Sequence, residues 1–141
     1  MDNVIKEKIS ADHLLYVSLK YTKTCDVIIN LLFRWKVMIE MAMEELIKKA
    51  KKNKKWKPVP EAPRAKLVQL KKIYADEFIV FETLKIYEMF RDLEKLDKIR
   101  ENEFRKGVNL KVTYEGKLVN INLDKLKEYS DLLEKFISYL K

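Results

Sequence analysis

One stretch of the chain, from Asp76 to Gly107, limits the fold more than any other feature. It contains no proline, and its only glycine is the last residue. Many of its apolar residues are spaced alternately four and three apart, which places them on one side of an α-helix. We therefore predict a continuous helix from Asp76 to Gly107, around which the rest of the chain is organised.

Two opposite charges, Asp97 and Arg100, interrupt the apolar side of this predicted helix. Their spacing on a helix allows a local salt bridge, which matters because a buried charge is costly unless it is paired. Two interpretations stay open. Either the helix extends beyond the core here and this side meets solvent, or the charges line a groove or a dimer interface with Arg105 nearby. The positions on this side are Ile79, Thr83, Ile86, Phe90, Leu93, Asp97, Arg100 and Phe104.

Length and composition favour one helical domain. The chain has 141 residues, enough for a single core. Its 2 glycines and 3 prolines favour long helices over a sandwich or barrel. We predict a mainly α fold, a bundle of four or five long helices with a β-hairpin before the C-terminal helix. The single domain 1–141 then divides into a helical bundle (10–107), a hairpin (108–123) and a last helix (124–140).

The N-terminal part is expected to begin with a loose arm at residues 1–9. Ser10 is a suitable N-cap for a following helix, and the four-three spacing continues from there to Lys52. The simplest interpretation is one helix from Ala11 to Lys52. Between Tyr21 and Asp26, however, β-branched and cap-forming residues cluster. A break there would give two helices, and both alternatives stay open.

The segment from Lys48 to Lys57 holds seven lysines. It is either the solvated end of a long helix, where cations suit the negative end of the helix dipole, or a surface that binds phosphates. Trp56 would pin the linker to the bundle in the first case and stack on a base in the second. The candidate nucleic-acid contacts are Lys48, Lys49, Lys51, Lys52, Lys54, Lys55, Trp56, Lys57 and Arg105.

Prolines follow this segment, and the next helix is predicted to have Pro63 in its first turn and to end near Ala75.

After Gly107 the spacing of the apolar residues changes from the helical pattern to every second residue. A two-residue turn at Glu115–Gly116 predicts a β-hairpin with one apolar face, which must lie against helices. Asn122 or Asp124 then caps the last helix. The predicted cross-strand pairs are Val112 with Val119, Leu110 with Ile121, and Val108 with Leu123; the predicted buried side of the last helix is Leu126, Tyr129, Leu133, Phe136 and Leu140.

No cofactor or metal site is predicted. The chain has one histidine, His13, and one cysteine, Cys25, and it has no glycine-rich phosphate loop. A nucleophilic Cys25 would need His13 as its base, yet the two lie about 18 Å apart along a continuous helix. The single cysteine fits a reducing cytoplasm. We also expect no signal peptide and no membrane span, because Met1–Lys8 is charged and the apolar run Val27–Phe33 is short.

The segments Ser10–Tyr16, Thr24–Asp26 and Asn102–Lys106 resemble the HEPN superfamily, and more narrowly its small archaeal helical proteins. The resemblance implies a four- to five-helix unit that is often dimeric. It also implies a role as a ribonuclease, or with RNA or a nucleotidyltransferase-like protein as partner. Active members carry an arginine followed, after four to six residues, by a histidine. Counted from Arg100 or from Arg105, no histidine occurs in that window. The resemblance therefore implies binding more than catalysis.

The leading functional prediction is a non-catalytic module that binds RNA or a protein. The net charge of +8 is compatible with anionic partners, and the abundance of Lys and Glu is typical of hyperthermophile proteins. The alternative is a ribonuclease that uses Asp97, Arg100 and Glu101 across a dimer. We predict a homodimer because large apolar residues occupy more than one side of the long helices. These residues are Phe33, Trp35, Met38, Met41, Met43, Phe78 and Phe81.

Overall fold

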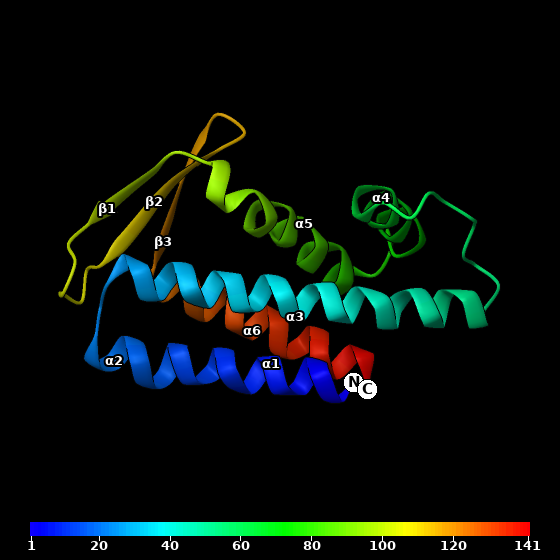
Figure 1. Cartoon of the computed structure of the whole chain (residues 1–141), viewed down its shortest axis with the longest axis horizontal. Coiled ribbons are helices and arrows are strands. Elements are labelled where there is room, and N and C mark those ends of the chain that lie inside the picture. Colours follow the sequence, from blue (N-terminus) through cyan, green and yellow to red (C-terminus); the bar gives the residue numbers. More distant parts are fainter.

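Five helical segments and a small antiparallel sheet make up the chain in the computed structural model, which describes residues 1–141 (Figure 1). The predicted mainly α fold with a hairpin before the last helix is confirmed. The helices are α1 (Asp2–His13), which continues through the π-helical segment η1 (Leu14–Ser18) into α2 (Leu19–Tyr21), α3 (Cys25–Lys52), α4 (Pro63–Ile73), α5 (Phe78–Asp92) and α6 (Leu123–Leu140). A short 3-10 turn, η2 (Leu93–Lys95), precedes the strands β1 (Lys98–Glu101), β2 (Asn109–Tyr114) and β3 (Lys117–Asn122).

Helix α3 lies at the centre of the core. The rod formed by α1, η1 and α2 runs back along it, α6 lies alongside, and α5 crosses the other side (Figure 1). Trp35 of α3 is 2% exposed and stacks on Phe90 of α5 with ring centroids 6.2 Å apart. Tyr129 of α6 meets both rings edge-on. Three helices from distant parts of the chain therefore share one aromatic cluster.

The chain breaks between α2 and α3, so the simplest interpretation, a single helix Ala11–Lys52, is wrong, and the alternative of two helices is correct. Thr24 takes an extended conformation, and its Oγ1 accepts a hydrogen bond from the backbone N–H of Val27 at 3.3 Å. This N-cap satisfies one of the free donors at the start of α3. The helix-ending effect of the cap-forming residues is therefore stronger than the continuous four-three spacing of apolar residues.

The predicted loose arm at residues 1–9 is also wrong, because Asp2–His13 is helical and Ser10 lies inside the helix rather than at its N-cap. Val4 is 1% exposed and Ala11 is fully buried. The Met1 amino group also forms an ion pair with Glu45 of α3 at 3.2 Å. Packing against α3 stabilises a segment whose own apolar pattern is weak.

The predicted helix from Asp76 to Gly107 is correct only as far as Asp92. Beyond η2 the chain forms β1, which pairs antiparallel with β2, Lys98 opposite Val112 and Arg100 opposite Leu110. The Lys98 ammonium donates to the carbonyl of Leu93 at 2.7 Å, at the end of the helical region. Asp97 and Arg100 therefore share no helix and no local salt bridge. Strand pairing outweighs helix propensity in this segment.

The hairpin has the predicted register, with Val112 opposite Val119 and Leu110 opposite Ile121, while the described pairing ends at Asn109 and Asn122, one residue before the predicted pair of Val108 and Leu123. Glu115 and Gly116 have φ angles of 52° and 76°, as a type I′ turn requires. Asn122 caps α6 through Oδ1, which accepts from the Lys125 N–H at 2.8 Å. Pro63 begins α4 as predicted. All five residues predicted for the inner side of α6 are buried.

Candidate functional site

The lysine segment Lys48–Lys57 forms the far end of α3 and the start of the linker to α4 (Figure 1). Two of its lysines are engaged with the bundle. Lys48 pairs with Glu45 at 3.9 Å, and the Lys49 ammonium donates to the Leu140 carbonyl at 2.9 Å. Trp56 is partly buried against the core, which agrees with its predicted role in holding the linker. The exposed lysines without an ion pair are Lys51, Lys52, Lys54, Lys55 and Lys57.

The three candidate catalytic residues lie in or just before β1 and do not converge. The Arg100 guanidinium pairs with Asp26 at 2.7 Å and with Glu103 at 3.4 Å, and the hydrogen bond to Asp26 raises the pKa of Arg100. Glu101, the next residue, accepts a hydrogen bond from the Asn109 amide at 2.9 Å. Successive residues of a strand point to opposite faces, and Asp97 is exposed before the strand begins. Within one chain, the three therefore share no common site.

A different set of residues does converge. The outer face of the sheet, the β1–β2 loop, the α2–α3 turn and the start of α6 enclose a hollow of about 600 Å³. A second hollow of about 230 Å³ adjoins it along η1 and α2. They share Lys23, Leu123 and Lys127, and we call the two together the Asn–Lys groove. Its remaining lining residues are Leu15, Tyr16, Leu19, Lys20, Asn102, Lys106, Gly107, Asn109, Asn120, Asn122 and Asp124.

The fold holds the two sides of this groove together by backbone contacts. The Phe104 N–H donates to the Lys23 carbonyl at 2.7 Å, which joins the β1–β2 loop to the α2–α3 turn. The carboxylate of Glu103 accepts from the N–H of Cys25 at 3.1 Å. Burial raises the pKa of the Cys25 thiol, so this cysteine supports the loop and is not an activated nucleophile. These hydrogen bonds between distant segments therefore fix the two sides of the groove relative to each other.

Asparagine side chains form the sheet side of the groove. Asn109 lies opposite Asn122 in the pairing of β2 with β3. Its amide nitrogen donates to Glu101 at 2.9 Å and to the Asn120 carbonyl oxygen at 3.0 Å. Its own Oδ1 is buried and has no partner. Buried acceptors are almost always satisfied, so this oxygen is an exception in the wall of the groove.

Positive charge dominates the groove. Four lysines line it, Lys20, Lys23, Lys106 and Lys127, against the single carboxylate of Asp124. Lys106 and Lys127 are exposed and have no ion pair. The lining contains neither histidine nor cysteine. The groove therefore has groups that attract and hydrogen-bond an anion.

Irregular backbone surrounds the groove. Asn102 and Phe104 have φ angles of 53° and 68°, in the left-handed region, which asparagine tolerates but which costs energy for phenylalanine. The π-helical segment that carries Tyr16 forms the opposite wall. Such strain and π-helical turns are frequent at functional sites. Tyr16 is 57% exposed, so its ring is accessible to a ligand.

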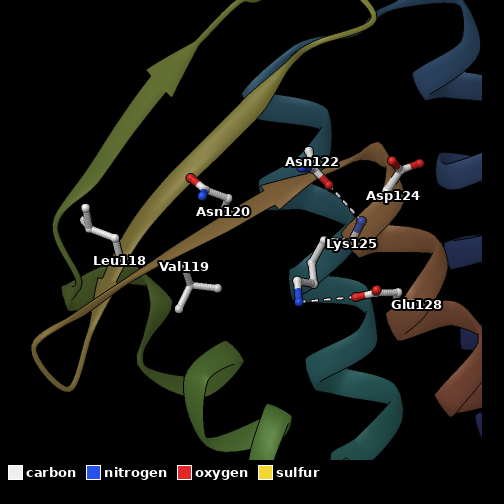
Figure 2. A pocket seen from close by; sticks show the side chains of 7 residues that line it. All are labelled: Leu118, Val119, Asn120, Asn122, Asp124, Lys125 and Glu128. Carbon is white, nitrogen blue, oxygen red and sulfur yellow. Dashed lines mark hydrogen bonds and ion pairs between the residues drawn. The ribbon is translucent and has the colours of Figure 1, made fainter.

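Figure 2 shows a neighbouring hollow of about 470 Å³ between β3 and the start of α6. It shares Asn120, Asn122 and Asp124 with the groove. Leu118 and Asn120 lie on one side of β3, while Val119 lies on the other (Figure 2). Lys125 is paired with Glu128 at 3.2 Å here, so this hollow has no excess of positive charge. Of these two adjacent hollows, only the groove has an excess of positive charge.

No cluster of three or more His, Cys, Asp or Glu side chains is arranged to hold a metal ion. None of the helices combines the length and the apolar character that a membrane span requires. Comparison with protein-family models, with curated proteins and with solved structures finds no significant match to this chain. The site is therefore interpreted from its geometry.

Sequence reasoning missed most of the groove. Of the predicted nucleic-acid contacts, only Arg105 lies in a segment that forms it, the β1–β2 loop. One signal was available, because the predicted hairpin register places Asn109, Asn120 and Asn122 on the same face. The lysines lie in α2, the α2–α3 turn, the β1–β2 loop and α6, and no sequence spacing connects the first two of these segments with the last two.

Proposed function

We propose that this protein is a non-catalytic RNA-binding module that holds RNA in the Asn–Lys groove. The observation that carries the proposal is the gathering of four lysines, four asparagines and one exposed tyrosine around a single groove. Lysines attract phosphates. Asparagine amides donate to and accept from base edges, and an exposed ring stacks on unpaired bases. The phosphate and the base of a nucleotide then each have a matching group.

The resemblance to the HEPN superfamily supports a role with RNA. The absence of a histidine in the window after Arg100 or Arg105 supports binding over cleavage. The lone buried cysteine suits a reducing cytoplasm, where we expect the module to act. The lysine segment lies at the other end of α3, about 40 Å away at the usual helical rise. The groove and the lysine segment are therefore independent surfaces.

Binding of a fluorescein-labelled single-stranded RNA, followed by fluorescence anisotropy, tests this proposal. The groove variant is Lys106→Glu/Lys127→Glu, and the matched control is Lys55→Glu/Lys57→Glu, which makes the same charge change at the lysine segment. All four lysines are exposed, so folding should be preserved and is checked by circular dichroism. We expect the groove variant to bind at least about tenfold more weakly and the control to change less than about twofold. Raising the salt concentration from about 50 to 200 mM should steeply weaken RNA binding by the wild type.

Three results would contradict the proposal. Equal loss in the control would move the RNA contact to the lysine segment. Cleavage of the RNA that Arg100→Ala abolishes would support the ribonuclease alternative with Asp97, Arg100 and Glu101. Absence of any binding at low salt would favour a protein partner for the groove.

A further inference from the structure

A second concave surface lies at the other end of the molecule, between the linker and α4. We call it the linker hollow, of about 500 Å³, and it is distinct from the Asn–Lys groove. Its floor is apolar and includes Val68, a helix residue that is 49% exposed. No carboxylate lines it. The lining residues are Val59, Pro60, Ala62, Arg64, Ala65, Val68, Gln69 and Lys72.

Two cations line this apolar floor. They are Arg64 and Lys72, and both are exposed without an ion pair. Of the five unpaired lysines between Lys51 and Lys57, the first two end α3 and the other three lie in the linker that leads to the hollow. The nearby carboxylate of Glu61 is already paired with Lys66 at 2.9 Å. The positive charge of this end of the molecule is therefore not balanced within the chain.

The backbone at the end of α3 places one of these lysines in a strained conformation. Lys54 has a φ of 58°, and the following N–H, of Lys55, donates to the Ala50 carbonyl at 2.8 Å. This is the position after a helix where glycine is usual, because glycine adopts it without strain. Lysine is more strained at this position than glycine would be.

We propose that the linker hollow docks an acidic segment of a partner protein. Apolar side chains of the segment occupy the hollow over Val59, Pro60 and Val68. Its carboxylates meet Arg64 and Lys72 and extend towards the lysines of the linker. Charge complementarity selects this occupant. A nucleic acid fits less well, because the floor has no exposed aromatic ring for a base to stack on and Trp56 is packed against the core. This docking does not depend on RNA binding by the groove.

A designed peptide of about 16 residues is the probe, with leucines on one helical face and glutamates on the other. One comparison peptide replaces the leucines by serine, and a second replaces the glutamates by glutamine. Binding is measured by anisotropy at about 100 mM salt, where weak electrostatic contacts are partly screened. We expect the full peptide to bind at least about tenfold more tightly than either comparison peptide, because apolar and charged contacts both contribute.

Two protein variants and one control locate the site. Val68→Asp adds a negative charge to the apolar floor, and Lys55→Glu/Lys57→Glu reverses charge beside it. Each should weaken binding of the peptide at least about tenfold. The groove variant Lys106→Glu/Lys127→Glu should bind the peptide as tightly as the wild type. Circular dichroism checks that each variant is folded. If Val68→Asp unfolds the protein, Lys55→Glu/Lys57→Glu still tests the site, because both lysines are exposed.

The proposal fails if the full peptide does not bind, or if the serine peptide binds as tightly, since the apolar hollow then contributes nothing. It also fails if the groove variant no longer binds the peptide while Val68→Asp and Lys55→Glu/Lys57→Glu still bind it. RNA is also added to the complex of the peptide with the groove variant. If this RNA displaces the peptide, the lysine end contacts nucleic acid instead. RNA binding by the groove is measured separately, so either proposal can fail without the other.

Discussion

At the scale of single residues, burial sets the chemistry of Tyr129. Its side chain is 9% exposed, and its ring meets that of Phe90 edge-on at 5.4 Å. Burial, with a smaller contribution from the charge of Glu128, raises the pKa of Tyr129 to about 12. The neutral phenol is therefore favoured by the folded state more than by the unfolded state.

The free energy of unfolding should consequently depend on pH through Tyr129. The stabilisation is complete below pH 10, the ordinary tyrosine pKa, and is lost as pH rises from there towards about 12. The loss is at most about 2.7 kcal/mol, from a shift of about two pKa units. Urea unfolding at pH 8 to 11 should show a smaller decline for Tyr129→Phe than for the wild type. Tyr21→Phe, at a tyrosine that is 78% exposed, should keep the wild-type decline.

The N-cap Thr24 is the residue on which the start of α3 depends, because its hydroxyl oxygen accepts the Val27 N–H. Removing this acceptor leaves the donor without a partner at the helix end. We expect Thr24→Ala to lower the free energy of unfolding by about 1 kcal/mol. Thr22→Ala is the matched control, since Thr22 is exposed two residues earlier. An equal effect of both substitutions would contradict the capping role.

At the scale of secondary-structure elements, the hairpin turn contains an avoidable strain. A type I′ turn needs positive φ at both central residues, and Glu115 adopts 52° there. Asparagine tolerates this conformation better than glutamate. Glu115→Asn should therefore stabilise the protein by about 0.5 kcal/mol, seen as a higher urea midpoint. Glu115→Val should lower the midpoint, because a β-branched residue is disfavoured at positive φ.

At the scale of the whole molecule, the oligomeric state remains a prediction. Of the apolar residues that suggested a homodimer, Trp35, Met38 and Met43 are buried by neighbouring helices. Phe33 and Phe78 stay exposed, at 47% and 69%. The case for a dimer now rests on these two exposed rings, one on α3 and one at the start of α5.

Light scattering tests the dimer directly. We expect a mass of twice the 16.9 kDa of one chain, and dissociation on Phe33→Glu. Phe33 is surface-exposed, so this substitution should leave the fold of the chain intact, as circular dichroism would show. A mass of 16.9 kDa for the wild type at about tens of micromolar would contradict the homodimer.

The sequence by itself determined the elements whose causes are local. Alternation, a Glu-Gly turn and an asparagine cap within Asn109–Asn122 were enough to predict the hairpin register and the start of α6. Likewise, Pro63 marked the start of α4. Each of these signals acts over a few residues, so no knowledge of distant partners is needed.

Only the tertiary structure decided the rest. Asp97–Phe104 continues a helical pattern, yet its pairing with β2 makes Lys98–Glu101 a strand. Asp2–Ile9 has a weak pattern of its own, yet packing on α3 makes it helical. The Asn–Lys groove exists because the Phe104 N–H reaches the Lys23 carbonyl, 81 positions earlier in the chain. These outcomes depend on contacts between distant segments, whose free energy outweighs local propensity and leaves no periodic signal in the sequence.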